Sequence, residues 1–439
     1  MRTAGLGLHV SAAPKSASVL MLAQQLRGGG RVKSRHAWSG CSPVVVDYLL
    51  SHLGFFSILP VLPLLLTRLQ AGMGAAWLGA MLLAFNFAVR GGSLLCNRIL
   101  NNIPIRIAIA GGLLVAGAGF ALLAVAPGQL GLLCCLVLAG FGVSANGLAA
   151  RAYVTMVVPE ARGRATVFAA IQVAANISAA FGPMIASFLA GEHRYVFLLR
   201  LVAGMYGLAA IFVAVVIRAG LRPRDASSRK PLLAGLFATI ATDQGVRRVS
   251  LATLVGSFLY GQFFSAFVLE VSQLTSSAVL RASFFTANAV AVVALQVPTA
   301  RHTRRGLDRS MPALRYLLIG TVTFSAACLI IGIAGSAVVG AFAGVAVFSL
   351  AETYFSPAVN IAYAEIAGDR PVVEAFNLRQ VAVAIGESLG SFCGSAVFLP
   401  AVTHGLRAEY WITLAIVGAA VSCAYLRNTV PAKKIQLDV

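Results

Sequence analysis

The sequence predicts an all-helical integral membrane protein in which twelve transmembrane helices form two related six-helix bundles. Three observations predict this fold class. First, 59% of the residues are hydrophobic and only 11% are charged, whereas about a quarter of the residues are charged in soluble proteins. Second, apolar segments long enough to cross a bilayer recur along the chain. Third, a pattern of small residues around Gly182 returns around Gly390, 208 positions later.

The apolar segments define the predicted spans. A helix needs about 20 apolar residues to cross a hydrocarbon core of about 30 Å. Twelve segments meet this length: 44–66, 75–96, 107–126, 130–157, 165–189, 195–217, 249–272, 279–299, 316–335, 337–363, 376–400 and 409–427.

The longest internal polar segment lies between the sixth and seventh spans and predicts the boundary between the two halves. The predicted domains are a disordered cytoplasmic tail (1–43), an N-terminal bundle (44–217), a cytoplasmic linker (218–248), a C-terminal bundle (249–427) and a second cytoplasmic tail (428–439).

The fifth and eleventh spans carry the repeated small residues. Ser178, Gly182 and Pro183 in span five correspond in position to Gly386, Gly390 and Ser391 in span eleven. Small residues allow neighbouring helix backbones to approach closely, and a repeat of this kind indicates a duplicated unit. We therefore expect close helix packing at both places.

Basic residues predict the orientation in the membrane. Most of the 34 Lys and Arg residues fall in one alternating set of loops and in the two tails. Only Arg68, Arg194, Arg281 and Arg407 fall in the other set. Because cytoplasmic loops carry the excess of Lys and Arg, both termini are expected in the cytoplasm. The net charge of +20 then reflects topology and contacts with anionic lipids, so no nucleic-acid partner is expected.

Two six-span halves joined by a cytoplasmic linker resemble the major facilitator superfamily, over nearly the whole chain from Val44 to Arg427. The Gly182-Pro183 element is similar to the fifth-helix antiporter motif of that superfamily, which implies the group of drug and small-molecule proton antiporters. The loop motif after span two is reduced to Gly92–Arg98, with Asn97 where the family has an acid. Its counterpart after span eight retains Asp308 and Arg309. Arg98, Asp308 and Arg309 are therefore gating candidates.

Ionisable residues inside the spans are candidates for proton coupling. A charged side chain at the bilayer centre costs about 2.5 to 3.5 kcal/mol on insertion scales, so such residues usually face a cavity or a partner. Glu387 and Glu352 are the leading candidates, and a structural hydrogen bond between helices is the alternative for each. Asp47 and His52 are further candidates. For Asp47 the alternative is an ion pair with Arg90, and for His52 it is a packing role.

Uncharged polar residues at depth predict a substrate cavity. Gln172 and Gln380 are related by the repeat and are expected to face each other across it. Aromatic neighbours such as Phe85, Phe168, Tyr260, Phe264 and Tyr354 would supply apolar walls. The alternative for each polar residue is a hydrogen bond between helices. The full set of candidates is Asn86, Arg90, Asn146, Gln172, Asn176, Gln262, Asn288, Asn360 and Gln380.

These patterns favour a secondary transporter that exports a small organic molecule or drug in exchange for protons. A uniporter or an importer of the same fold is the first alternative, and an integral-membrane enzyme is the second. No phosphate-binding loop of a primary pump is present, and the seven cysteines form no C-x-x-C pair, so no metal and no cofactor are expected. We expect a multi-pass monomer in the plasma membrane, and the Ala, Gly and Arg usage favours a bacterial inner membrane.

Overall fold

The computed structural model describes residues 30–100, 102–158, 161–191, 194–222, 232–366 and 372–426. In this part of the chain, twelve helices are long and apolar enough to cross a membrane. They coincide with the twelve predicted spans, so the predicted fold class is confirmed. The orientation of the termini stays a prediction.

The first six spans are built from eight elements. They are α2 (Gly30–Ile58), η1 (Leu59–Val61), α3 (Leu62–Leu69), α4 (Ala75–Leu100), α5 (Ile105–Leu122), α6 (Gly128–Val157), α7 (Ala161–Gly191) and α8 (Tyr195–Val216). Their buried side chains form one hydrophobic core.

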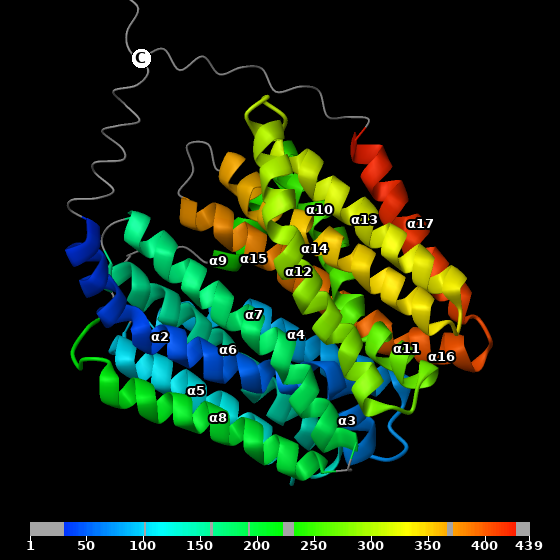
Figure 1. Ribbon diagram of the computed structural model, residues 1–439, viewed down its shortest axis with the longest axis horizontal. Helices are drawn as coiled ribbons and strands as arrows, with labels where there is room; N and C mark the ends of the chain where they lie inside the picture. Colours follow the sequence, from blue (N-terminus) through cyan, green and yellow to red (C-terminus); the bar gives the residue numbers. More distant parts are fainter. Residues whose placement is uncertain are drawn as a thin grey trace, which may run out of the picture.

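The remaining elements form the second half of the described chain. They are α9 (Leu232–Thr242), α10 (Gln244–Gly261), η2 (Gln262–Phe264), α11 (Ala266–Leu274), α12 (Ala278–Leu307), α13 (Ala313–Ala334), α14 (Val338–Glu365), α15 (Val372–Ala396), α16 (Phe398–Thr403) and α17 (Arg407–Leu426). Their buried side chains form a second core. We call these two sets of helices the N-terminal and C-terminal bundles (Figure 1).

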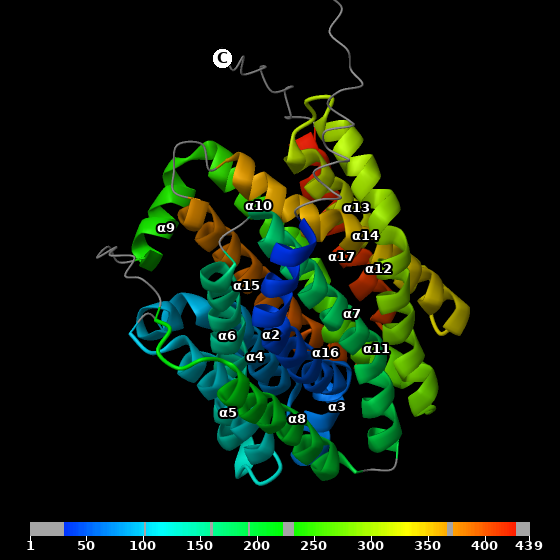
Figure 2. The ribbon, with the colours of Figure 1, turned by 60° about the vertical axis from the view of Figure 1, so that its left-hand side comes forward.

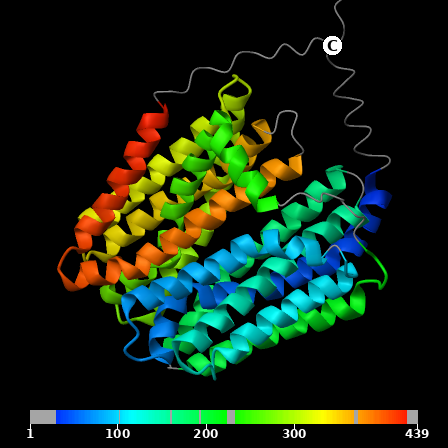
Figure 3. The same ribbon diagram turned by 180° about the vertical axis from the view of Figure 1, so that it is seen from behind.

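The two bundles meet along two pairs of helices. In the turned view, α15 lies against α4 and α12 lies against α7 (Figure 2). The view from behind separates the N-terminal bundle, blue to green, from the C-terminal bundle, green to red (Figure 3). We refer to the end of the molecule that carries α3, α11 and α16 as the α3/α11 end. The opposite end, where α6 ends and α7 begins, is the α6/α7 end.

Helix boundaries differ from the sequence prediction at two places. Helix α2 begins at Gly30, so residues 30–43 of the predicted disordered tail are helical, and residues 1–29 lie outside the described part. Helix α9 lies within the predicted linker, and α10 begins at Gln244 rather than at residue 249. Hydropathy marks where a segment becomes apolar, whereas helical hydrogen bonding continues into the polar flank. The domain boundaries themselves, including the tail 428–439, stay a prediction.

Both bundles contain a span that is interrupted near its middle. Span one breaks at η1, where Pro60 cannot donate a backbone hydrogen bond. Span seven breaks at η2, which contains no proline. There the side chain of Gln262 is buried: its Nε2 donates to the carbonyl of Gly390 at 3.0 Å and its Oε1 accepts from the Tyr410 hydroxyl at 2.6 Å. A side chain therefore holds this break in place.

The repeated small residues lie at close helix crossings. A Cβ atom at Gly182 of α7 would come within 2.7 Å of the Phe56 backbone in α2. A Cβ atom at Gly386 of α15 would come within 2.5 Å of the Leu254 carbonyl in α10, and Gly390 is closer still to α10. The fifth span thus crosses the first span in the same way as the eleventh crosses the seventh, which agrees with the duplication inferred from the sequence.

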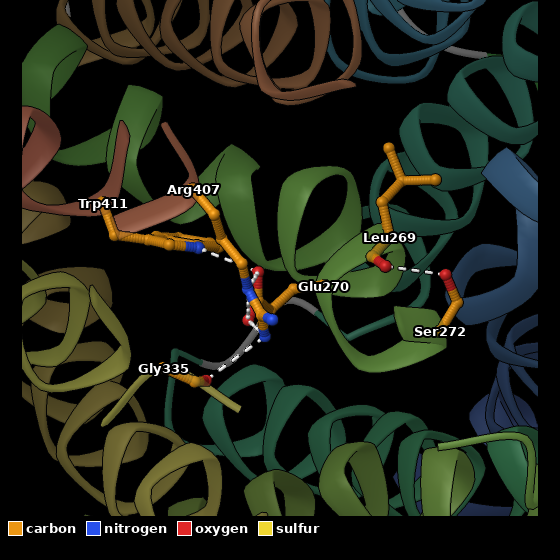
Figure 4. Close-up of polar contacts among 6 residues, drawn as sticks. All are labelled: Leu269, Glu270, Ser272, Gly335, Arg407 and Trp411. Atoms are coloured by element: carbon orange, nitrogen blue, oxygen red, sulfur yellow. Dashed lines mark hydrogen bonds and ion pairs between the residues drawn. The ribbon is translucent and has the colours of Figure 1, made fainter. Parts of the chain in front are cut away.

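A buried ion pair fastens the α3/α11 end of the C-terminal bundle (Figure 4). Glu270 of α11 is 1% exposed, and Nε of Arg407 in α17 donates to its two carboxylate oxygens at 2.8 and 3.0 Å. Trp411 donates to the same carboxylate at 3.2 Å, and Arg407 donates to the Gly335 carbonyl at 3.2 Å. This network fixes α11 to α17 and to the turn between α13 and α14.

Candidate transport cavity

A large cavity lies between the two bundles. It has a volume of about 720 Å³ and adjoins a second space of about 460 Å³, with which it shares Arg90, Gln172, Tyr260 and Glu352 among other residues. Helices α2, α4, α6 and α7 contribute one wall, and α10, η2, α12, α14 and α15 contribute the other. The volume lies within the range of about 300 to 1,000 Å³ that is typical of small-molecule sites.

The cavity reaches the α6/α7 end and narrows toward the α3/α11 end. Phe168, near the start of α7, and Phe376, near the start of α15, line the wide part. At the other end lies a small pocket of about 30 Å³. There the Ser187 hydroxyl donates to the Ala278 carbonyl, and the Thr286 hydroxyl donates to the Ala180 carbonyl at 3.1 Å. Helices α7 and α12 are therefore joined at the narrow end.

Aromatic rings form much of the apolar wall. Phe168, Tyr260, Phe264 and Phe285 line the cavity. Tyr260 stacks on Phe348 at 5.8 Å between ring centroids, which fixes its orientation. Two aromatic residues that were predicted to face the cavity lie elsewhere: Phe85 is fully buried in the N-terminal core, and the Tyr354 hydroxyl is 2.9 Å from Nδ1 of His302. The apolar wall therefore comes mainly from span seven and its neighbours.

Three polar contacts join α4 of the N-terminal bundle to α15 of the C-terminal bundle. Arg90 Nε donates to Glu387 Oε2 at 2.7 Å. One turn away, Asn86 Nδ2 donates to the Ser391 hydroxyl at 2.9 Å, and Gln380 Nε2 donates to the carbonyl of Arg90. We call these five residues the α4–α15 polar seam. They link the bundles beside the cavity, because both Arg90 and Glu387 line its smaller part.

The second predicted proton carrier faces the cavity from the C-terminal bundle. Glu352 of α14 lines both parts of it. Asn288 of α12 donates to Glu352 Oε2 at 3.4 Å and accepts from the Ser349 hydroxyl at 2.8 Å. This small network positions the carboxyl group of Glu352. Among the described residues, no basic side chain lies within ion-pair distance of it.

Asp47 and His52 occupy different surroundings in span one. Asp47 is fully buried and accepts hydrogen bonds from Asn146 Nδ2 at 3.1 and 3.2 Å. The alternative of an ion pair with Arg90 is therefore not realised, because Arg90 turns toward Glu387 instead. His52 lines the cavity and stacks on Tyr48 with ring centroids 4.6 Å apart.

Most of the predicted cavity residues line the cavity, including the repeat-related Gln172 and Gln380. Three make other contacts: Asn86 lies in the seam, Asn146 binds Asp47, and Gln262 holds η2. Periodicity places a residue at a depth in the membrane, but the face it presents depends on the packing partner. The predicted residues that line the cavity are His52, Arg90, Gln172, Asn176, Asn288, Glu352, Asn360, Gln380 and Glu387.

Sequence reasoning missed two arginines as cavity residues. Arg151 of α6 and Arg379 of α15 are absent from the predicted cavity residues, but both line the cavity near the α6/α7 end. A signal was present in the sequence: Arg379, Val383 and Glu387 are spaced by four residues, which places them on one face of a helix.

The gating candidates have local roles in this structure. Ser178 is buried and donates to the Leu49 carbonyl at 3.0 Å, and Pro183 lines the cavity. Asp308 is 4.0 Å from Arg304 in an exposed pair, and Arg309 is exposed. The side chain of Arg98 lies outside the described residues. None of the described loop residues among these candidates contacts the opposite bundle in an ion pair.

The sequence is similar to a known family and to several named proteins. The profile of the Major Facilitator Superfamily matches residues 45–312. The chain is 25% identical over 380 residues to the multidrug resistance protein MdtH of Aeromonas hydrophila, covering 85% of this chain and 91% of that protein. It is 24% identical to MdtH of Salmonella arizonae, covering 85% and 90%.

Solved structures of transporters share the fold. A POT family transporter in complex with 5-aminolevulinic acid has a TM-score of 0.72 at 13% identity, covering 88% of this chain and 95% of that one. A peptide transporter POT in complex with sulfate also has a TM-score of 0.72 at 13% identity, covering 88% and 94%. Two six-span bundles around a shared cavity, together with a profile match over more than half of the chain, identify a multi-pass membrane transporter: the protein belongs to the major facilitator superfamily.

Proposed function

We propose that this protein is a proton-coupled secondary transporter that exports a small organic molecule from a bacterial cell across the plasma membrane. Three features support this proposal: the cavity is shared by two bundles, it contains two carboxyl groups at depth, and it is closed at one end by contacts between the bundles. The MdtH relatives carry the name multidrug resistance protein, which favours drug-sized substrates.

The observation that carries the proposal is the ion pair between Arg90 and Glu387. It joins the two bundles and borders the cavity. Alternating access requires the bundles to rock against each other around a central site. A proton on Glu387 would remove the negative charge that holds Arg90, and the seam would then be held only by weaker contacts between neutral groups. Protonation and bundle movement are thereby linked through one residue pair.

Glu352 is the second carboxyl group in this scheme. It lies in the same cavity and has no basic partner within ion-pair distance among the described residues, so its proton can exchange with water that enters from the α6/α7 end. The energy available is sufficient for export: one proton entering down about 100 mV supplies about 2.3 kcal/mol, which supports roughly a 50-fold gradient of a neutral solute. One carboxyl group that binds and releases one proton in each transport cycle is enough for this gradient.

The test compares Glu387→Gln and Glu352→Gln with the wild type in proteoliposomes. The substrate is the compound against which overexpression gives the strongest resistance in a growth-inhibition screen of toxic compounds. We expect Glu387→Gln to abolish uptake driven by a proton gradient while exchange of labelled for unlabelled substrate continues. Glu409→Gln is the matched control, because Glu409 is exposed at the start of α17 and away from the cavity.

The alternatives make different predictions in the same assay. If transport by the wild type does not respond to the proton gradient, the protein is a uniporter. If the substrate moves in the same direction as the protons, it is an importer. If the gradient drives transport equally in the wild type and in both cavity variants, neither carboxyl group couples protons and the proposed mechanism is wrong. The match to the Major Facilitator Superfamily favours a transporter over an integral-membrane enzyme.

A further inference from the structure

Two arginines in the cavity lack an acidic partner. Arg151 of α6 and Arg379 of α15 line the larger part of the cavity from opposite bundles. Within the described residues neither forms an ion pair. Arg379 Nη1 donates only to Gln380 Oε1 at a long 3.3 Å, and its Nε is buried without any hydrogen-bond partner. Buried donors of this kind are nearly always satisfied in proteins, so Nε of Arg379 is a donor that an acceptor in the cavity would satisfy.

The charges lining the cavity do not balance. Two acids, Glu352 and Glu387, face it, and Glu387 is already paired with Arg90. Glu352 of α14 accepts a hydrogen bond from Asn288. Among the described residues it forms no ion pair with Arg151 or Arg379. The wide part of the cavity is therefore positively charged.

Guanidinium groups bind acids through two parallel N–H donors, and this geometry matches carboxylate, sulfonate and phosphonate groups. The adjoining surface is apolar and aromatic, with Phe168 and Phe264 on opposite sides of the cavity. A ligand that satisfies both surfaces has one acidic group and a hydrophobic body of drug size.

We propose that the cavity binds an organic anion, whose acidic group lies between Arg151 and Arg379 and whose apolar body contacts the aromatic wall. This inference rests on the proposed transport function and names its substrate class. Because the two arginines belong to different bundles and repel each other, a bound anion draws the wide end of the cavity together. Substrate binding thereby favours the movement that closes the α6/α7 end.

The experiment measures binding to the purified full-length protein in nanodiscs by isothermal titration calorimetry. The probes share one apolar body and differ in charge: 2-naphthoate, 2-naphthamide and 2-naphthylmethylammonium. Two further anions, 1-anilinonaphthalene-8-sulfonate and phenylphosphonate, extend the range of acid groups. The discs contain phosphatidylcholine alone, so that no anionic lipid competes for the arginines.

We expect at least one anion to bind, and naphthoate to bind at least tenfold more tightly than the amide and the ammonium. Arg151→Gln and Arg379→Gln should each weaken anion binding about tenfold, because each removes one charge-assisted contact. Arg151→Lys and Arg379→Lys retain the charge and should recover part of the affinity. Arg315→Gln is the control, since Arg315 is exposed at the start of α13. Thermal unfolding of each variant identifies any that fails to fold.

Several outcomes overturn the proposal. They are equal binding of the three naphthalene compounds, tighter binding of the ammonium, no binding of any anion by wild-type protein, and loss of binding that is no larger in the two cavity variants than in Arg315→Gln. Discs that contain phosphatidylglycerol test a second source of the same chemistry. If this lipid abolishes naphthoate binding, the arginines bind lipid head groups and the substrate proposal is wrong.

Failure of this inference can be distinguished from failure of the proposed transport function. The calorimetric assay contains no proton gradient and reports only the charge preference of the cavity. A protein that exports a cation in a proton-dependent way would retain the proposed function and refute the anion site. A protein that binds naphthoate through both arginines but transports it without coupling to protons would retain the site and refute the coupling.

Discussion

Removing the ion pair between Arg90 and Glu387 should shift the balance between the conformations of the transporter. The pair joins α4 to α15 at 2.7 Å, with 41% of the Arg90 side chain and 10% of the Glu387 side chain exposed. Exposed ion pairs contribute about 0 to 1 kcal/mol, whereas breaking a fully buried pair costs about 3 to 5 kcal/mol. For this partly exposed pair we expect a contribution of about 1 to 2 kcal/mol to the free-energy difference between the conformations, which is a factor of about 5 to 30 in the equilibrium constant.

The shift can be measured as a distance distribution. Spin labels at Val173 of α7 and Arg301 of α12, both exposed, report the separation of the bundles by double electron–electron resonance in a cysteine-free background. In Arg90→Gln and Glu387→Gln, the population in which the cavity reaches the α6/α7 end should fall by about 5- to 30-fold relative to its alternative.

The double variant provides the internal control. If the pair acts as a unit, Arg90→Gln and Glu387→Gln together should change the equilibrium no more than either alone, so that the coupling free energy approaches the single effect. Unchanged distributions in both single variants would refute the reasoning. Additive effects with a coupling below about 0.5 kcal/mol would show that the pair does not act as a unit.

Three further predictions concern stability, each measured by thermal or denaturant unfolding of the purified protein. Glu270→Ala should destabilise the protein by about 3 to 5 kcal/mol because Arg407 loses its buried partner. Glu409→Ala, at an exposed position, should have little effect. Equal destabilisation by the two variants would contradict a stabilising role of the ion pair between Glu270 and Arg407. Gly390→Ala should cost about 1 to 3 kcal/mol through overpacking against α10, whereas Gly207→Ala, which has no neighbour within 4 Å of the added Cβ, should be tolerated. Asp47→Ala should cost about 1 to 3 kcal/mol by leaving Asn146 without an acceptor, and Asp47→Asn should recover most of it; a large loss in both variants would point to a role for the charge itself.

The fold could be predicted from the sequence because the bilayer imposes simple rules on it. Every backbone polar group must be satisfied within the hydrocarbon core, so each apolar segment of sufficient length becomes a helix. The repeated glycines also predicted that spans five and eleven pack closely against neighbouring helices, because only a residue without Cβ fits where Gly182 meets α2. Those two signals are local in sequence, and both are reproduced in the structure.

The polar contacts were harder to predict because they depend on which faces of distant helices meet. Depth alone made Asp47 and Arg90 plausible partners, yet Arg90 turns toward Glu387 in the other bundle. Gln262 has the depth of a cavity residue but lies on the face of η2 that packs against α15 and α17. Arg379 shares a helix face with Glu387, but the packing of α15 decides that this face meets the cavity.

In the proposed mechanism, the position of Glu387 allows one carboxyl group to link protonation to movement of the bundles. A carboxyl group buried within a single bundle, such as Asp47, changes the stability of that bundle when it is protonated but leaves its neighbour unaffected. Glu387 instead contacts the opposite bundle through Arg90 and borders the cavity that water and substrate enter. A ligand shifts a conformational equilibrium only by its differential affinity for the two states. In the proposed mechanism, a proton on Glu387 has a different affinity for the two states, because the contact with Arg90 is made only while α4 and α15 remain together.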